Sequence, residues 1–290
     1  MRISPQSEAP PPTLPAIDYL VIGHLSEDRT PDGISLGGTV SYAGLTAHSL
    51  GHAVGVVTAA AESTDLEPLD NISLIVKSSP HSTCFQNTYT REGRTQVVFS
   101  QAVGLSLEDV PREWWDTELI HIGPLMRELT SDIMEPFQAS FVGITPQGLM
   151  RESDSEGNIS ALPWETAADF IENSDAVVLG IEDLDMNEEA TSAVAEICSN
   201  VAITYGAQGA RVWADEQWRS FPARPADEFD ATGAGDIFAA TFFSRLHDSG
   251  DPWIAAKTAV RLASTSVTRY GLSGAPTASE AEAALKQEDS

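Results

Sequence analysis

Lysine, cysteine and long apolar runs are all scarce in this chain of 290 residues. Only three lysines occur, and the 16 Lys and Arg residues face 43 Asp and Glu residues, which gives a formal net charge of −27. Such a surface repels nucleic acid and anionic lipid, so neither is expected as a partner. Two explanations of the acidity stay open, adaptation to a salt-rich cytoplasm and ordinary lineage bias. Stability and activity measured against salt would separate them.

The other scarce features exclude several kinds of site. Two cysteines, Cys84 and Cys198, provide neither a disulfide framework nor a C-x-x-C metal site, which favours a reducing cytoplasm. The histidines form no H-x-x-x-H pair on a plausible helix, so a zinc site is not expected. No apolar stretch approaches the ~20 residues of a membrane helix. Residues 1–16 are rich in proline and lack the apolar segment of a signal peptide, so we expect a flexible arm before one domain over 17–290.

The sequence does contain a regular alternation of apolar strands and helices. Buried strands are predicted from apolar runs at 17–23, 53–60, 72–76, 119–123, 141–144, 176–179 and 201–205. Helices are predicted at 39–50, 188–198, 236–247 and 253–270. This alternation favours an α/β fold, in which helices cover both faces of a parallel sheet. Residues 83–100 read instead as a hairpin with one wet face, which is typical of a lid, and 211–221 as a smaller hairpin.

The most specific motif is Asp230-Ala231-Thr232-Gly233-Ala234-Gly235-Asp236, directly before an apolar run. Glycines let the backbone approach a ligand closely, and the start of a helix offers free N–H groups to an anion. Asp236 adds a proton acceptor beside that anion site. The combination predicts phosphoryl transfer to a hydroxyl, whereas the Walker A, G-x-S-x-G and H-E-x-x-H patterns are absent. The alternative is a glycine-rich turn that only caps a buried helix.

This motif resembles the D-T-x-G-A-G-D-x-F signature of the ribokinase-like, or PfkB, carbohydrate kinases, with Ala231 where Thr is usual. The resemblance covers about residues 17–276. It implies a ribokinase-like three-layer α/β/α sandwich with a mainly parallel sheet and a small β lid, built from segments near 26–36 and 83–101. It also implies ATP and Mg²⁺ as cofactors and Asp236 as the base. The backbone N–H groups that stabilise the transferring phosphoryl group would be those of Gly233, Ala234 and Gly235.

The resemblance assigns a second group of residues to the nucleotide. Thr204, Gly206 and Gly209 match a T-x-G-x-x-G segment that lies against the nucleotide in the family, and Asp230 and Thr232 are placed on the same side. A tight turn between two strands is the alternative for the first three. Their position about 25 residues before the anion-binding turn, as in the family, favours the nucleotide.

The phosphate acceptor is assigned to the N-terminal half. Gly37 and Gly38 precede a small-residue helix and resemble the family's first signature, where a glycine pair meets the sugar. Asp28, after the first strand, stands where the family hydrogen-bonds substrate hydroxyls. Tyr42 replaces the usual Asn, and its ring would narrow the pocket or stack on a substrate face. The segment Gly38–Ala43 resembles the branch that contains inositol kinases.

Two further segments concern the acceptor and the metal. Gln147 and Arg151 resemble the Q-G-x-x-R segment of the inositol-kinase-like branch, so they are predicted to line the cleft. A surface ion pair is the alternative for Arg151. The family's N-x-x-E motif, which organises Mg²⁺ through water, is altered here, because Gly180 replaces the Asn. Asp183 or Glu182 must then stand for the Glu, and we expect phosphates and waters to hold most of the metal.

The sequence therefore predicts an ATP-dependent kinase in a three-layer α/β/α fold. Its acceptor is a hydroxyl of a sugar or cyclic polyol, with a myo-inositol-like compound as the first choice. A ribose, hexose or nucleoside kinase is the alternative within the enzyme class. A catalytically silent sugar or nucleotide sensor is the alternative outside it. The family resemblance also suggests a homodimer formed through the lid.

Overall fold

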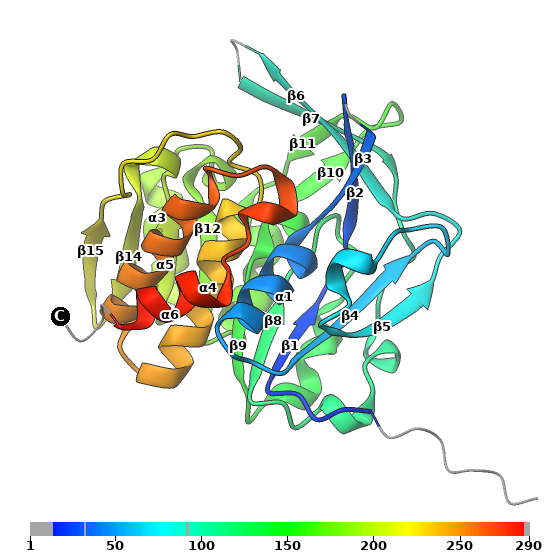
Figure 1. The fold of residues 1–290 in the computed structure, drawn as a ribbon. Helices are drawn as coiled ribbons and strands as arrows, with labels where there is room; N and C mark the ends of the chain where they lie inside the picture. The colour runs from blue at the N-terminus through cyan, green and yellow to red at the C-terminus, as the bar shows by residue number, and fades with distance from the viewer. Residues whose placement is uncertain (1–13, 32, 91–92, 287–290) are drawn as a thin grey trace, which may run out of the picture.

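The computed structural model describes residues 14–31, 33–90 and 93–286, so most of the predicted arm (1–13) lies outside the described residues. A nine-stranded sheet runs through the centre, in the order β15-β14-β13-β12-β9-β8-β1-β4-β5 (Figure 1). All seven predicted apolar strands are confirmed within it. The strand bounds are β1 Tyr19–Ile22, β4 Val54–Ala60, β5 Ser73–Ser78, β8 Leu119–Ile122, β9 Phe141–Ile144, β12 Ala176–Gly180, β13 Val201–Thr204, β14 Ala210–Ala214 and β15 Gln217–Phe221.

The sheet is parallel except at one edge. β1 pairs in parallel with β4 and β8, and β12 pairs in parallel with β9 and β13, whereas β14 and β15 are antiparallel. Every residue of β1 and of β4 is buried, as expected for strands covered on both faces. Burial on both faces of the sheet therefore explains why these strands are continuous apolar runs in the sequence.

Alternate strand residues face two separate core layers. On one face Val21, Val56 and Phe242 belong to a core built with α1 (Thr39–Ser49), α4 (Ala234–Ser249) and α5 (Pro252–Ser266). On the other face Leu20 and Ile120 pack with α2 (Ala168–Glu172) and α3 (Glu188–Ile197). Figure 1 shows α1, α4 and α5 side by side in front of the sheet. The predicted three-layer α/β/α fold is confirmed.

Several elements differ from the sequence prediction. The connection between β8 and β9 contains a 3-10 segment, Ser131–Phe137, with Pro136 inside it, instead of an α-helix. The predicted ranges do not include the β10–β11 hairpin (Arg151–Ser153 with Ile159–Ala161), α2 or α6 (Ala278–Lys286). Helix α5 ends at Ser266, four residues before its predicted end. The carbonyl of the next residue, Val267, accepts hydrogen bonds from the N–H groups of Phe229 and Asp230.

The two segments predicted to form a lid pair with each other. They give a second, four-stranded sheet in the order β3-β2-β6-β7, called the lid sheet below. Its strands are β2 Ser26–Thr30, β3 Gly33–Gly37, β6 Thr83–Thr90 and β7 Gly93–Ser100. The lid sheet lies at the top of the main sheet in Figure 1. Closure of this sheet over a substrate stays a prediction.

Helix α4 runs antiparallel to the strands that it covers. A Cβ at Gly143, in β9, would lie 2.5 Å from the Phe243 ring, and His247, one turn later, lies 5.9 Å from Phe141, where β9 begins. Each turn of α4 therefore moves toward the start of β9. The helix N-terminus, Gly233–Asp236, accordingly lies at the opposite edge, where the parallel strands end.

His121, in β8, makes the fold sensitive to acid. Its imidazole is fully buried, with the Tyr19 hydroxyl 3.2 Å from Nδ1 and the Thr145 hydroxyl 3.2 Å from Nε2. Burial lowers the pKa of His121 to about 3. The unfolded chain binds a proton near the ordinary pKa of ~6.5, which the folded chain does not bind. Its contribution to stability is therefore complete above pH ~6.5 and is lost toward about pH 3 by up to ~1.4 kcal/mol per pH unit.

We expect His121→Gln to reduce this loss of stability. Between about pH 7.5 and about pH 5, the free energy of unfolding should fall by ~2 kcal/mol less in His121→Gln than in the unaltered protein. Urea denaturation at the two pH values measures the difference. His81→Gln is the control, because His81 is exposed. Equal losses of stability in the unaltered protein and in His121→Gln would contradict the expectation.

Candidate active site

The parallel strands end at one edge of the sheet, and the segments that follow them meet there. In an open α/β sheet, ligands bind at the carboxyl ends of the strands. The chain segments at this edge follow β1, β8, β9, β12 and β13, and they are residues 23–28, 123–128, 145–150, 180–183 and 204–209. The N-terminus of α4 reaches the same edge. This edge is therefore the candidate active site.

The N-terminus of α4 forms the predicted anion-binding turn. Gly233 is the N-cap residue, with φ 79° and ψ −4°, in the left-handed region that favours glycine. The Ala234 N–H donates to the carbonyl of Ala231 at 3.2 Å, and the Ile237 N–H begins the helical pattern by donating to Gly233. A Cβ at Gly235 would meet no atom within 4 Å. The helix dipole and the open space at Gly235 suit an anion.

Asp230 anchors this turn to the end of α5. One carboxylate oxygen accepts from the Thr232 N–H and the other from the Gly271 N–H, each at 2.9 Å. The N–H groups of Phe229 and Asp230 donate to the carbonyl of Val267. Both oxygens of Asp230 are thus engaged with the backbone. In this structure Asp230 and Thr232, predicted to face the nucleotide, stabilise the conformation of the turn.

Tyr42 joins the turn to the acceptor side. Its side chain is 2% exposed and packs with Ile237, and a Cβ at Gly233 would lie 2.3 Å from Cδ1 of its ring. The pKa of the Tyr42 phenol is raised well above its ordinary value, first by burial and then by the carboxylates of Asp230, Asp236 and Asp28. The phenol therefore stays neutral. Carboxylates from two distant parts of the sequence, the α4 turn and the lid sheet, thus act on this one ring.

Asp28 and the glycine pair lie in contact on the lid side. Asp28, in β2, is opposite Ser35 of β3, and its Oδ1 accepts a hydrogen bond from the Ser26 hydroxyl at 3.3 Å. A Cβ at Gly37 would lie 2.5 Å from Asp28 Oδ2, and one at Gly38 would lie 2.8 Å from the backbone nitrogen of Ser26. At Gly38, where φ is 86° and the close neighbour is backbone, only glycine fits. The structure thus brings together the predicted acceptor residues Asp28, Gly37 and Gly38.

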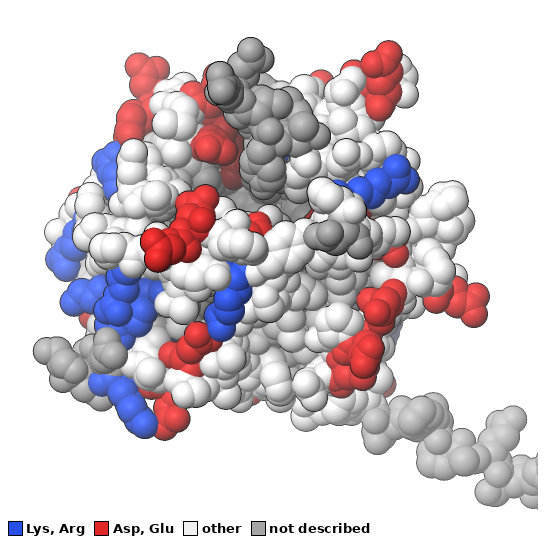
Figure 2. Space-filling view, turned by 45° about the horizontal axis from the view of Figure 1, so that its top comes forward, with Lys and Arg blue, Asp and Glu red and all other residues white. Residues whose placement is uncertain are grey.

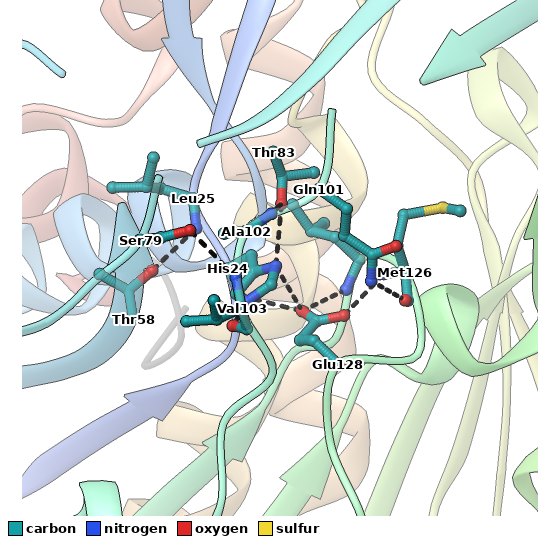
Figure 3. Close-up of polar contacts among 11 residues, drawn as sticks. His24, Leu25, Thr58, Ser79, Thr83, Gln101, Ala102, Val103, Met126 and Glu128 are labelled. Carbon is teal, nitrogen blue, oxygen red and sulfur yellow. Dashed lines mark hydrogen bonds and ion pairs between the residues drawn. The ribbon is translucent and has the colours of Figure 1, made fainter. Parts of the chain in front are cut away.

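A buried junction of His24, Thr83 and Glu128 lies under this region (Figure 3). The Glu128 carboxylate accepts from three backbone N–H groups, those of His24 at 3.0 Å, Leu125 at 2.8 Å and Met126 at 2.7 Å. His24 lies four residues before Asp28. Glu128 thus ties the segment after β8 to the segment that carries Asp28.

The same junction reaches the roots of β6 and β7. His24 Nε2 lies 2.9 Å from the Val103 carbonyl and Nδ1 lies 2.9 Å from the Thr83 hydroxyl, which accepts from the Ala102 N–H at 3.1 Å. Nε2 must donate to the carbonyl, so neutral His24 accepts at Nδ1. The segments that enter and leave the lid sheet therefore meet at one buried imidazole. No motif indicated His24 or Glu128, because a lone histidine and a lone glutamate carry no spacing signal.

Gln147 and Asp183 form a second cluster at the strand ends. Gln147 Nε2 donates to Asp183 Oδ1 at 2.5 Å, and the Gly180 N–H donates to Oδ2 at 2.9 Å. Both side chains are half-buried, whereas Glu182 is exposed. Of the two carboxylates left open by the sequence, Asp183 is the one held in place. Arg151 is the first residue of β10, whose hairpin pairs with lid strand β7 through Asn158.

The predicted nucleotide turn connects β13 to β14. The Thr204 hydroxyl donates to the Leu179 carbonyl at 3.3 Å, and the Tyr205 N–H donates to the Gly209 carbonyl at 2.8 Å. Gly209 has φ 97°, and a Cβ there would lie 2.1 Å from the Phe221 carbonyl oxygen. Gly206 has φ 54° and open space around it. Gly209 is thus required by packing, and Gly206 is the glycine that a ligand could approach.

Comparison with known proteins relates part of this chain to one family. Residues 167–278, which contain the α4 turn, Asp183 and the β13–β14 turn, match the profile of the pfkB family carbohydrate kinases. A cytidine kinase from Thermococcus kodakarensis is 27% identical over 257 residues, which cover 79% of this chain and 88% of that protein.

Solved structures show the same fold as this chain. A pyrophosphate-dependent kinase in the ribokinase family, complexed with a pyrophosphate analog and myo-inositol, superposes with a TM-score of 0.77 and 22% identity, over 91% of this chain and 99% of that one. An E. coli protein assigned as a ribokinase II, in complex with ATP and Mg²⁺, superposes with a TM-score of 0.73 and 17% identity, over 94% and 100% of the two chains. The ribokinase-like fold is confirmed.

Two properties of the chain bear on membranes and metals. Within residues 14–31, 33–90 and 93–286, none of the helices combines the length and apolar character needed to cross a bilayer. Over the same part of the chain, no group of three or more His, Cys, Asp or Glu side chains could hold a metal ion. A metal in this site would therefore need ligands beyond the protein, which is how Mg²⁺ commonly binds together with phosphates and water.

Acidic residues outnumber basic ones in this chain, 43 to 16. Figure 2 shows Asp and Glu residues scattered over the face that includes the top of Figure 1, with Lys and Arg gathered mainly on one side. An anionic donor would approach this face against a net charge of −27. A cation bound to the donor reduces that repulsion.

Proposed function

We propose that this chain transfers the γ-phosphoryl group of ATP to a hydroxyl of a sugar or cyclic polyol, with Asp236 as the general base. The observation that carries the proposal is the convergence at Tyr42. Asp236 and the anion-binding turn come from the C-terminal third, and Asp28 comes from the lid sheet, yet all lie around one buried ring. An acceptor site, a base and an anion site side by side are the parts that phosphoryl transfer requires.

Each residue then has one task. Asp28 accepts hydrogen bonds from acceptor hydroxyls and orients them. Asp236 takes the proton of the attacking hydroxyl as its oxygen bonds to the γ-phosphorus, and the bond from that phosphorus to the β-phosphate oxygen breaks, releasing ADP. The N–H groups at the start of α4 stabilise the charge on the transferring group. Mg²⁺ supplies neutralisation of the phosphate charge, and Asp183 is the carboxylate that would hold it, through water.

For the acceptor, a myo-inositol-like polyol is our first choice. The Gly38–Ala43 resemblance and the fold of the kinase solved with myo-inositol support it. A nucleoside is the second choice, supported by the cytidine kinase relative. Tyr42 affects which of the two acceptors fits, because its ring lies against Gly233 and borders the acceptor side of the site.

A coupled assay of ADP release tests the function. We expect release only when an acceptor is present, with myo-inositol, ribose, fructose and cytidine compared at equal concentration. Replacing ATP with pyrophosphate, and detecting the phosphorylated acceptor directly, tests the donor. If none of these acceptors is phosphorylated with either donor, the kinase proposal fails, and ATP or sugar binding without turnover would favour the sensor.

A further inference from the structure

The orientation of Asp183 depends on one side chain from a neighbouring strand end. Asp183 follows β12, and Gln147 follows β9, which pairs directly with β12. Each Asp183 oxygen accepts one hydrogen bond, Oδ1 from Gln147 at 2.5 Å and Oδ2 from the Gly180 N–H at 2.9 Å. A carboxylate oxygen can accept two hydrogen bonds, so each oxygen can still accept another. The Gln147 amide therefore restrains the carboxylate, and both oxygens can still accept a further hydrogen bond.

Asp183 lies at the same edge as the phosphoryl-transfer turn. Helix α4 contacts β12 as well as β9, and its antiparallel course brings Gly233–Asp236 to the end of these strands. Asp28, Asp230 and Asp236 already converge there around Tyr42. A polyphosphate donor would add negative charge beside these carboxylates. A divalent cation held near Asp183 would offset that repulsion.

We infer that Gln147 is a positioning residue that orients Asp183 to accept hydrogen bonds from the waters of a divalent cation carried by the phosphoryl donor. The inference rests on the proposed function. It moves Gln147 from the acceptor side, where the sequence predicted it, to the donor side. Glycine at 180 leaves Asp183 no side-chain partner from that position, and the Gln147 amide provides one from the next strand.

Two variants of Gln147 test the inference. Gln147→Ala removes the amide, and Gln147→Met keeps a side chain of similar length but removes the N–H donor. Outer partners of metal ligands commonly change metal affinity by 10–100-fold, so for both variants we expect ~10-fold weaker Mn²⁺ binding in the presence of ADP. Electron paramagnetic resonance measures that binding without turnover. The Mg²⁺ concentration for half-maximal activity should rise by a similar factor, while the acceptor KM and metal-free ADP binding stay unchanged.

Controls separate this role from a structural one. Gln138→Ala removes an exposed glutamine just before β9 begins, at the opposite edge of the sheet, and should leave Mn²⁺ binding unchanged. Asp183→Asn should lose at least as much Mn²⁺ affinity as Gln147→Ala. Adding Gln147→Ala to it should cost little more, because both act on one group.

The outcomes are distinct. Unchanged Mn²⁺ affinity with a raised acceptor KM in both Gln147 variants would overturn the inference and return Gln147 to the acceptor. No metal-dependent ADP binding by the unaltered protein would also overturn it. Normal Mn²⁺–ADP binding without turnover on any acceptor would instead count against the proposed function alone, since the binding measurement needs no acceptor.

Discussion

Asp236→Asn is expected to reduce turnover by ~10²–10⁴-fold, the usual effect of losing a general base. The amide has nearly the shape of the carboxylate but cannot take the proton of the attacking hydroxyl. Asp236 lies in the first turn of α4, close enough to the Tyr42 phenol to raise its pKa. Nucleotide binding should change little, because the backbone N–H groups of the turn remain. Steady-state kinetics and ADP titration measure the two effects separately.

Asp248→Asn is the matched control for this prediction. Asp248 belongs to the same helix but lies near its other end, in an ion pair with Arg245. Its replacement should leave turnover within about twofold, since surface ion pairs contribute ~1 kcal/mol or less to stability. Turnover of Asp236→Asn close to that of the unaltered protein would remove Asp236 from the role of base.

Gly233→Ala is expected to cost turnover ~10²–10³-fold, the effect of losing donors to a developing charge. Two physical terms act together here. The residue has φ 79°, which L side chains rarely adopt, and its Cβ would lie 2.3 Å from the buried ring of Tyr42. The ring has little room to retreat, because it is packed with Ile237. The turn must therefore shift, and the N–H groups aimed at the phosphoryl group shift with it.

Gly250→Ala separates strain from collision. Gly250 is the C-cap of the same helix, with φ 66°, and a Cβ added there would meet no atom within 4 Å, so alanine carries backbone strain alone. We expect it to cost ~1 kcal/mol of stability with unchanged turnover. Kinetics and urea denaturation of the two variants give the comparison. Equal losses of turnover in Gly233→Ala and Gly250→Ala would show that the contact between Gly233 and Tyr42 does not affect catalysis.

Much of the fold could be predicted from the sequence because buried parallel strands leave a direct trace. Strands such as β4, buried at every residue, must be apolar throughout. The 3-10 segment Ser131–Phe137 leaves no comparable trace, since it lacks a helical period and contains a proline. The end of α5 could not be predicted from the sequence either. It depends on the Val267 carbonyl, which accepts from a segment nearly 40 residues earlier in the chain.

The residues of the candidate site also fall into two groups, those that the sequence indicated and those that it did not. Residues whose task depends on backbone geometry, such as Gly38 and Gly233, were found from the sequence because their positive φ and close neighbours require glycine. Residues whose task depends on a tertiary partner were not. The pairing of Gln147 with Asp183 spans two strands, and no local pattern encodes which acid a glutamine meets. The Glu128 carboxylate is a similar case, since its three backbone donors come from two loops.

Helix α4 has a consequence for how acid inhibition of this protein is interpreted. An acid limb in a pH–rate profile is ordinarily assigned to protonation of the catalytic base. Here the helix that carries Asp236 also packs, through Phe243, edge-on against the buried imidazole of His121 at 4.9 Å. We expect protonation of His121 to disturb this contact and with it the packing of α4. The apparent acid limb then combines protonation of Asp236, at the N-terminus of α4, with loss of packing around His121. His121→Gln is the variant that separates the two effects.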